Sequence, residues 1–252
     1  MNESAPYSVF AEFYDDVMSE IPYIEWVFYL QRLWDRHGIT PSRVLDLACG
    51  TGNMTYLLAG LGMNVVGVDL SEDMLEVARS KMCGDLEQQV SFLRGDMCSF
   101  ELKENMDLII CLFDSINYIL ESAELASVFA QVYKCLAADG WFLFDFNTEA
   151  GIRNIETENS VYKGEEYFCF WNNETDPQNY LWEARLTFYI KEQGDCWICK
   201  KEKHLERGYS RERISEELLI ADFKEAYFYR AYTLKQVTGD YEPDRIFAVA
   251  KK

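Results

Sequence analysis

A short apolar run that ends in a glycine-rich turn constrains the fold of this chain more than any other feature. Residues 44–48 are apolar except for Asp46, and the turn Cys49–Asn53 follows at once, with glycines at Gly50 and Gly52. A glycine has no Cβ atom, so a ligand can approach its backbone closely. In open α/β sheets, ligands bind beyond the carboxyl ends of the strands. The pattern therefore predicts a strand, a ligand-binding turn and a helix, in that order.

Two later strand-like runs end in a carboxylate. The run Val65–Asp69 ends in Asp69, and the run Val90–Leu93 is followed by Gly95 and Asp96. A carboxylate offers several hydrogen-bond acceptor sites. The first acid can accept from both hydroxyls of a ribose, and the second from the amino group of an adenine. Together with the glycine turn, they predict a nucleoside-binding site.

Helical patterns alternate with these runs. Residues 22–37 have an apolar stripe between Pro22 and Gly38, and Ser71 can cap a helix through about Met82. Strands that alternate with helices and are apolar throughout favour a parallel sheet covered on both faces. The predicted strands of this sheet are residues 44–48, Val65–Asp69, Val90–Leu93, Met106–Leu112 and Trp141–Asn147.

The pattern changes after residue 150. Three strands without helices between them are expected, with turns at Asp176-Pro177 and at Gly194-Asp195; the strands are Glu166–Asn173, Tyr180–Ile190 and Cys196–Leu205. A helix from Ser210 to about Ile220 and the strands Lys224–Tyr232 and Arg245–Ala250 then complete the α/β part. We expect a nucleotide-binding domain of residues 1–150 and 208–252, and an antiparallel three-stranded lid of residues 151–207 inserted into it.

Composition excludes several classes of protein. Lysines and arginines number 24 against 43 acids, a net charge of −19, so nucleic acid is not expected as a partner. The chain begins without a basic, apolar secretion signal, and it lacks the apolar stretch of ~20 residues that would cross a bilayer. We expect a cytoplasmic protein that does not enter the membrane. Its eight cysteines are typical of reduced core residues, and no metal site is expected. The oligomeric state stays open.

A dinucleotide-binding domain is the first competing interpretation. Its fingerprint is G-x-G-x-x-G. When the first two glycines are aligned on Gly50 and Gly52, Thr55 stands at the third position; one register earlier, Ala48 and Asn53 occupy glycine positions. Neither register fits.

Residues 42–147 resemble the class I S-adenosylmethionine-dependent methyltransferases. The family's D-x-x-x-G-x-G motif matches Asp46–Gly52, its ribose acid matches Asp69, and its adenine motif matches Gly95–Met97. One common form of the motif has a further glycine where Ala48 stands. The resemblance implies a Rossmann-like seven-stranded sheet whose last strand is antiparallel, and S-adenosylmethionine as cofactor. The cofactor-binding residues it implies are Asp46, Ala48, Gly50, Gly52, Asp69, Leu70, Asp96 and Met97.

A narrower resemblance covers nearly the whole chain. Phe10-Ala11-x-x-Tyr14-Asp15, Cys111–Tyr118 and His204-x-x-Arg207 look like a subgroup whose β-meander caps the active site. The layout is similar to that of the sugar amine N,N-dimethyltransferases and, more distantly, of glycine N-methyltransferase. It implies a small-molecule acceptor and in-line transfer of the methyl group to nitrogen or oxygen.

Three residues are candidates for catalysis. Asp114, after the fourth strand, could hold an ammonium group or the methionine amine of the cofactor, or it could be a helix cap or a loop acid. Tyr14 could reach the site from the N-terminal segment, or it could be a lid aromatic. His204 could act as an acid or base, or it could be structural. Candidate acceptor-binding residues are Tyr118, Asn117 and Arg207.

Other functions remain as alternatives. The chain lacks the N-P-P-Y or D-P-P-Y motif that grips a flipped base and the Pro-Cys nucleophile of pyrimidine C5 methylation. The alternatives to a small-molecule methyltransferase are an RNA or protein methyltransferase and a cofactor-binding regulatory protein without catalysis. The lid segment is rich in aromatic residues, and we expect some of them to line an acceptor pocket. Deleting residues 155–203 should then spare cofactor binding and abolish transfer.

Overall fold

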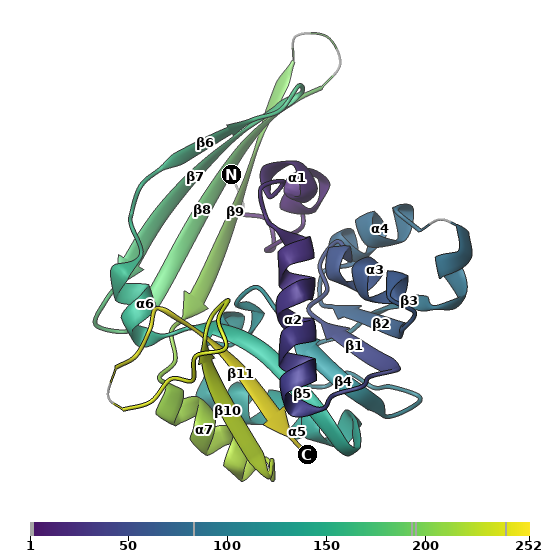
Figure 1. The fold of residues 1–252 in the computed structure, drawn as a ribbon. Helices are drawn as coiled ribbons and strands as arrows, with labels where there is room; N and C mark the ends of the chain where they lie inside the picture. The colour runs from purple at the N-terminus through teal and green to yellow at the C-terminus, as the bar shows by residue number, and fades with distance from the viewer. Residues whose placement is uncertain (1–2, 83, 193, 195, 240) are drawn as a thin grey trace.

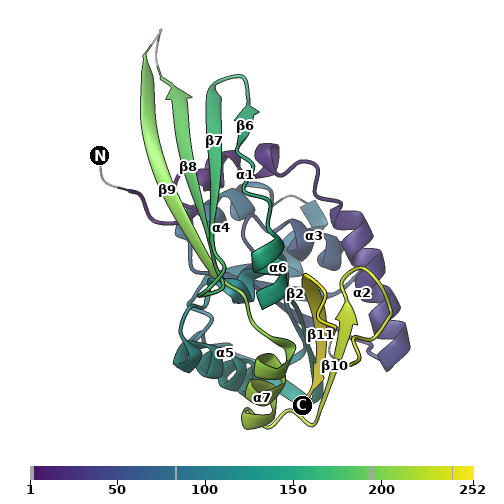
Figure 2. The same ribbon diagram turned by 90° about the vertical axis from the view of Figure 1, so that its left-hand side faces the viewer.

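The fold consists of an α/β layer structure from which a second, smaller sheet projects (Figure 1). The computed structural model describes residues 3–82, 84–192, 194, 196–239 and 241–252. Figure 2 shows the small sheet rising from the main body as an extended, twisted blade.

The main sheet has seven strands in the order β10-β11-β5-β4-β1-β2-β3. Strands β3, β2, β1, β4 and β5 pair in parallel, and β11 pairs antiparallel to both β5 and β10. The bounds are β1 (Arg43–Leu47), β2 (Asn64–Asp69), β3 (Val90–Arg94), β4 (Met106–Cys111), β5 (Leu136–Asn147), β10 (Glu225–Arg230) and β11 (Arg245–Lys251). The predicted seven-stranded sheet with an antiparallel last strand is confirmed.

Helices cover both faces of this sheet. Side chains of α2 (Tyr23–His37), α3 (Asn53–Gly60) and α4 (Glu72–Ser80) pack on one face, and those of α5 (Ser122–Cys135) and α7 (Arg211–Ile220) on the other. The remaining helices are α1 (Phe10–Val17), α6 (Glu149–Asn154) and the 3-10 turns η1 (Gly84–Gln88) and η2 (Ser115–Tyr118). Since both faces are covered, the inner strands are largely apolar.

The predicted helix starts follow from capping. Ser71 accepts a hydrogen bond from the Met74 N–H at the start of α4, and Ser210 accepts one from the Arg213 N–H at the start of α7. Each side chain satisfies a backbone donor that has no partner within its helix. Helix α4 ends at Ser80, two residues before the predicted end.

The small sheet is antiparallel and has four strands rather than the three expected. The additional strand, β6 (Ser160–Lys163), is a short edge strand with largely exposed residues, so its apolar periodicity is weak. The others are β7 (Tyr167–Asp176), β8 (Leu181–Lys191) and β9 (Trp197–Arg207). Asp195, in the expected turn before β9, lies outside the described residues. We call residues 160–207 the lid sheet.

Helix α1 lies against one face of the lid sheet (Figure 1). Phe10, Phe13 and Val17 pack on Tyr167 of β7 and on β8 side chains that include Phe188. The Phe13 and Tyr167 rings lie 4.4 Å apart, between their centroids. This cluster is separate from the two cores of the main sheet, so the N-terminal helix and the lid sheet share one small apolar core.

Candidate functional site

A cavity of about 700 Å³ opens at the carboxyl ends of β1, β2 and β3. Its volume is in the range of small-molecule sites, and its place is the one at which open α/β sheets bind ligands. The cavity wall includes the residues that the sequence motifs indicated, together with part of the N-terminal segment. Among the lining residues are Tyr7, Tyr14, Asp46, Ala48, Gly50, Asp69, Leu70, Asp96, Met97 and Tyr118.

The glycine turn has a left-handed backbone at three positions. The φ angles of Ala48, Gly50 and Gly52 are +58°, +54° and +78°. A Cβ atom on Gly52 would lie 2.9 Å from Cζ of Phe92, so only glycine fits between α3 and β3; Gly52 itself does not line the cavity. Gly50 has open space at its Cα and faces the cavity, as a residue needs to if its backbone contacts a ligand.

Asp69 is fixed by two backbone donors. Its Oδ2 accepts from the Gly50 N–H at 2.8 Å, and its Oδ1 from the Ser71 N–H at 2.9 Å. Burial raises the pKa of Asp69 above its ordinary value, although these two N–H groups act in the opposite direction. Each carboxylate oxygen keeps acceptor capacity, because an oxygen can accept about two hydrogen bonds. The turn and the carboxylate thus form one rigid unit that can accept a pair of ligand hydroxyls.

The third strand end supplies the far wall of the cavity. Asp96 accepts a hydrogen bond from the Cys98 N–H at 2.8 Å through Oδ1, which fixes the carboxylate beside Met97. Leu70 also lines the cavity, and 63% of its surface is exposed. A carboxylate between two apolar side chains suits a flat ring with an amino group, since the ring can lie on the apolar atoms while its N–H donates to the acid.

Asp46 is a buried acid at the base of the cavity. It accepts from the Thr55 hydroxyl at 2.6 Å. Burial raises its pKa to about 7, and the charge of Asp69 acts in the same direction. A cation that binds in the cavity would favour the ionised form of Asp46.

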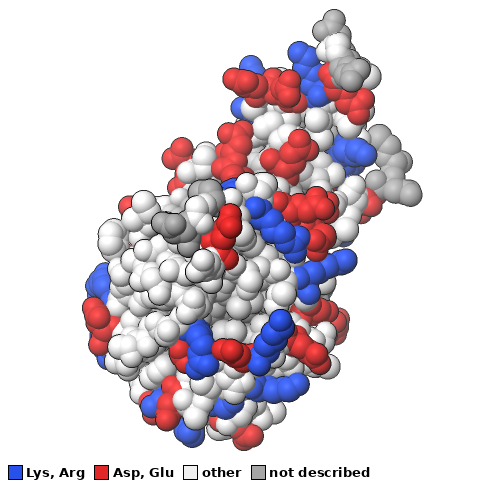
Figure 3. Space-filling model, turned by 90° about the vertical axis from the view of Figure 1, so that its right-hand side faces the viewer, with Lys and Arg blue, Asp and Glu red and all other residues white. Residues whose placement is uncertain are grey.

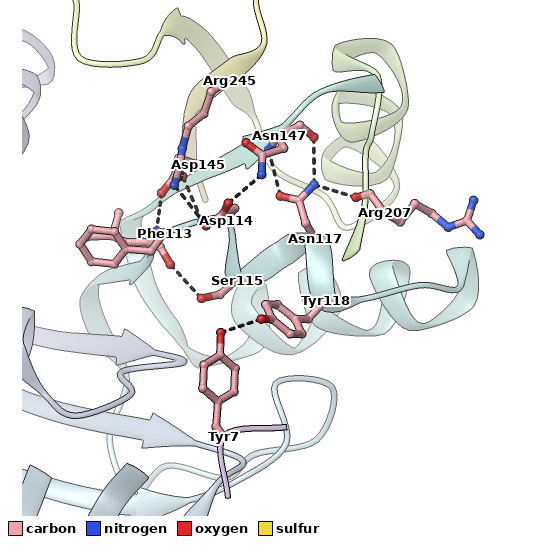
Figure 4. Close-up of polar contacts among 11 residues, drawn as sticks. Tyr7, Phe113, Asp114, Ser115, Asn117, Tyr118, Asp145, Asn147, Arg207 and Arg245 are labelled. Atoms are coloured by element: carbon pink, nitrogen blue, oxygen red, sulfur yellow. Dashed lines mark hydrogen bonds and ion pairs between the residues drawn. The ribbon is translucent and has the colours of Figure 1, made fainter. Parts of the chain in front are cut away.

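Aromatic hydroxyl groups line the opposite side of the cavity. Tyr14 of α1, Tyr118 of η2 and Tyr7 of the N-terminal segment all contribute to the wall. The hydroxyl groups of Tyr7 and Tyr118 lie 2.6 Å apart (Figure 4). The Tyr118 hydroxyl is also hydrogen-bonded to His204, at 3.0 Å from its Nδ1. His204 does not line the cavity, but Tyr118 connects it to the cavity wall.

Asp114 points away from the cavity. Its carboxylate lies 3.3 Å from the Arg245 guanidinium and accepts from the Asn147 side-chain amide at 2.7 Å (Figure 4). Arg245 also pairs with the buried Asp145, which accepts from the Asp114 and Phe113 N–H groups. These bonds fix the turn between β4 and η2. Asp114 is therefore not among the residues that line the cavity.

Asn117 and Arg207 join the lid sheet to the main sheet. The fully buried Asn117 amide donates to the carbonyl oxygens of Asn147 and Arg207, and its oxygen accepts from the Asn147 N–H (Figure 4). The Arg207 guanidinium points away from this bridge, toward the carbonyl of Asn179 at 3.3 Å. Neither residue lines the cavity, and their proposed contacts with an acceptor stay predictions.

Sequence reasoning missed two residues of this arrangement. Tyr7 lines the cavity, and Glu202 lies 3.3 Å from Nε2 of His204. The alternation Glu202-x-His204-x-Glu206 was a usable signal, because residues two apart in a strand share a face. All three side chains are buried. No signal in the sequence marked Tyr7.

Within the described ranges, no cluster of three or more potential metal ligands is present. No helix in the described part of the chain is long and apolar enough to cross a membrane.

Comparisons with known proteins agree with this geometry. Residues 44–140 match a family model described as a methyltransferase domain. A putative methyltransferase of Geobacillus sp. (strain WCH70) is 30% identical over 268 aligned residues, which cover 98% of this chain and 99% of the relative.

Two solved structures have a similar fold over almost the whole chain. An S-adenosylmethionine-dependent methyltransferase from Clostridium acetobutylicum ATCC 824 is 28% identical with a TM-score of 0.78, and the match covers 97% of this chain and 98% of that one. A sugar N-methyltransferase from Streptoalloteichus sp ATCC 53650 is 19% identical, also with a TM-score of 0.78, and the match covers 100% of this chain and 96% of that one.

Proposed function

Since this chain belongs to the class I S-adenosylmethionine-dependent methyltransferases, we propose that it methylates nitrogen or oxygen of a small-molecule acceptor. The observation that carries the proposal is the cavity, which is lined both by the strand-end acids and by the tyrosines. One wall fits the cofactor and the other fits a small polar acceptor. The similarity to a sugar N-methyltransferase supports an amine on a sugar-like acceptor as the first class to test.

The residues fit the cofactor group by group. In this proposal Asp69 accepts from the ribose hydroxyls, while Asp96, Leu70 and Met97 hold the adenine. Gly50 and Ala48 supply the backbone against which the methionine part lies, and Asp46 pairs with its ammonium. Gly52 acts indirectly, because it lets α3 approach Phe92 and so sets the path of the turn.

Methyl transfer depends on the position of the acceptor and on the exclusion of water more than on strong acids or bases. The bound cofactor supplies an electrophilic methyl group on a sulfonium centre. Holding the acceptor in line with that centre can contribute ~7–11 kcal/mol. Four aromatic residues line the cavity, and an aromatic ring attracts a cation with ~0.5–2 kcal/mol; they are Tyr7, Tyr14, Tyr23 and Phe113.

The need for a base depends on the acceptor. A neutral amine needs no base for attack, whereas a hydroxyl acceptor does. For a hydroxyl acceptor, the Tyr118–His204 pair is the proposed base. Asp114, Asn117 and Arg207 would act on the acceptor by shaping this wall.

We also propose that two parts of the chain have separate roles, as the sequence indicated. Residues 1–150 and 208–252 would bind the cofactor. Among the described residues of 151–207 none lines the cavity, contrary to the expectation for the lid aromatics, so this segment would select the acceptor indirectly, through Tyr7 and Tyr118. A cytoplasmic location is proposed with it, because the cofactor and small polar acceptors occur there.

A metabolite screen tests the proposed function. The protein and S-adenosylmethionine with a deuterated methyl group are incubated with a fractionated cell extract, and products are found by mass spectrometry. One or a few small molecules should gain the labelled methyl group, and at a low cofactor concentration the Asp69→Ala variant should label them more slowly. Label that appears in RNA or protein instead would favour those substrate classes, and absence of any labelled product would favour a regulatory protein.

Nucleic acid is not expected among the acceptors. The net charge is −19, and acidic and basic side chains are interspersed on the face drawn in Figure 3. Binding to phosphate backbones depends on clustered cations and weakens steeply with salt. A filter-binding titration with total cellular RNA near physiological salt should therefore detect no submicromolar binding.

A further inference from the structure

The N-terminal segment Ser4–Phe10, which we call the strap, crosses the cavity from the lid sheet to the main domain. At one end, the Ser4 N–H donates to the Lys201 carbonyl of β9 at 2.9 Å. In its middle, the carbonyl of Tyr7 accepts from the Ser71 hydroxyl at 3.0 Å, at the start of α4. The strap residues 5–8 line the cavity. A ligand in the cavity is therefore covered by the strap.

One buried carboxylate fastens the strap to the lid sheet. Glu202 of β9 is 1% exposed and accepts from the N–H groups of Tyr7, Val9 and Phe10, at 3.1 Å for Tyr7 and 3.0 Å for Phe10. The Ser8 hydroxyl oxygen lies 3.2 Å from the same carboxylate. Burial would raise the pKa of Glu202, but the bonds from His204 and from these N–H groups outweigh it and lower the pKa. Glu202 is therefore ionised while the strap is in place.

The ionised Glu202 fixes the direction of a hydrogen-bond chain. A carboxylate can only accept, so His204 must donate to it through Nε2. When the ring is in its neutral form, Nδ1 is then an acceptor, and the Tyr118 hydroxyl donates to it. Because Tyr118 then donates its proton to His204, its oxygen accepts from the Tyr7 hydroxyl, 2.6 Å away. At the cavity end of the chain, the Tyr7 oxygen keeps a lone pair that can accept a proton.

We propose that closure of the strap completes a proton relay, so that the acceptor's proton leaves through Tyr7, Tyr118 and His204 only when the cavity is covered. The inference rests on the proposed methyl transfer to a nitrogen or oxygen that carries a proton. Attack by this atom forms its bond to the methyl carbon and breaks the methyl–sulfur bond, whose electron pair stays on sulfur. The acceptor's proton passes to Tyr7, the Tyr7 proton to Tyr118, and the Tyr118 proton to Nδ1. The resulting imidazolium is stabilised by Glu202.

The coupling follows from the double role of Glu202. The same carboxylate that accepts from the strap's backbone also orients His204, and Tyr7 is itself part of the strap. When the strap leaves, the relay loses its first member, Tyr7, and Glu202 loses three backbone donors. Glu202 is thus a positioning residue, and Tyr7 is the relay member that faces the acceptor. In this proposal the acceptor loses its proton only while the strap covers the cavity.

The state of the His204 ring tests the relay without any acceptor. The chain has only two histidines, so nitrogen NMR of the full-length protein with bound S-adenosylhomocysteine resolves both rings. We expect His204 to carry its proton on Nε2, with an unprotonated Nδ1 whose signal moves in the Tyr118→Phe variant. His37, which is bonded to Tyr229, should stay unchanged. A proton on Nδ1 of His204 in the bound protein, in the neutral ring or in an imidazolium, would overturn the relay.

Dissociation of S-adenosylhomocysteine tests the coupling. Glu202→Gln should speed its release at least tenfold, because the uncharged side chain fastens the strap less well. The matched control Lys201→Gln changes the exposed neighbour on the opposite face of β9 and should release the ligand at the wild-type rate. Tyr7→Phe keeps the backbone bonds of the strap, so release should change less than twofold. Equal release rates in Glu202→Gln and Lys201→Gln would disprove the coupling.

Transfer into the fractionated cell extract distinguishes this inference from the proposed function. Tyr7→Phe should lower the rate of labelled product at least tenfold while S-adenosylhomocysteine binds as before. A wild-type rate in Tyr7→Phe would exclude the relay and leave the methyltransferase assignment intact. If the wild-type protein labels nothing, the proposed function fails, and the ring signals and release rates still decide the hydrogen-bond chain and the strap.

Discussion

At the scale of single residues, the Asp69 carboxylate links the glycine turn to the ligand site. It accepts from the Gly50 N–H and faces the cavity, so its removal should cost hydrogen bonds to the cofactor. We expect Asp69→Ala to weaken S-adenosylmethionine binding by ~1.5–3 kcal/mol, or about 10- to 150-fold. Calorimetry measures this, with Glu76→Gln as a control on the exposed face of α4. An unchanged dissociation constant in Asp69→Ala would remove this residue from the site.

Asp46 should make cofactor binding dependent on pH. Its pKa is about 7 because of burial, so at about pH 6 it is mostly protonated in the empty protein. An ammonium group beside it favours the ionised form, and binding should then release a proton. Below the pKa, affinity should fall as pH falls, by up to about tenfold per unit.

Calorimetry in two buffers with different ionisation enthalpies counts the released protons. Near pH 6 the wild-type protein should release most of one proton, and the Asp46→Asn variant should release measurably less. Near pH 8 the two proteins should agree, because Asp46 is already ionised there. Equal proton release at pH 6 would contradict the pairing of Asp46 with the ammonium.

At the scale of elements, the contact between β1, β2 and β3 depends on the absence of a side chain at Gly67. A Cβ atom there would lie 2.6 Å from Cδ1 of Phe92 and 2.8 Å from Sγ of Cys49. Gly67 pairs with strands on both sides, so its backbone cannot move away. We expect Gly67→Ala to destabilise the fold by about 1–3 kcal/mol in urea denaturation.

A second glycine provides the matched control. Gly60 ends α3, and a Cβ atom there would meet no atom within 4 Å. Alanine favours a helix over glycine by about 1 kcal/mol at most at such a position, so Gly60→Ala should be neutral or stabilising. If both variants lose equal stability, the packing argument for Gly67 is wrong.

The arrangement of the elements explains which parts of the site could be predicted from the sequence. The glycine turn and the acids Asp69 and Asp96 each follow a strand directly, so the parallel topology alone brings them to one edge of the sheet. Glu202 and Tyr7 are 195 positions apart, and only the docking of the strap on β9 makes them neighbours. Strand β6 was missed because it is short and mostly exposed. Local patterns thus predicted the cofactor side, and tertiary docking determined the other side.

At the scale of the whole molecule, the lid sheet and the N-terminal segment form one unit. The sequence alone predicts that deletion of residues 155–203 spares cofactor binding. In the structure this deletion would expose Phe10, Phe13 and Val17 and remove Glu202, which fastens the strap. We now expect the shortened protein to bind S-adenosylhomocysteine more weakly as well as to lose transfer.

Comparing the shortened chain with a Glu202→Gln chain separates loss of the strap's attachment from loss of the α1 packing surface. A chain with the lid sheet intact and Glu202→Gln should lose ligand retention but keep α1 in place, as judged by protection of its amide protons from exchange. The shortened chain should lose this protection. If the shortened chain binds the ligand with wild-type affinity, the strap and α1 do not depend on the lid sheet.

The shared core of α1 and the lid sheet also has a consequence for biosynthesis. The Tyr167 hydroxyl donates to Asp16 across 151 positions of the chain. At a translation rate of 5–20 residues per second, the apolar side of α1 waits roughly ten seconds or longer for its partner strands to leave the ribosome. During that time Phe10 and Phe13 have no native surface to cover them. Helix α1 is therefore buried only after the lid strands have been made, and until then the growing chain exposes an apolar surface.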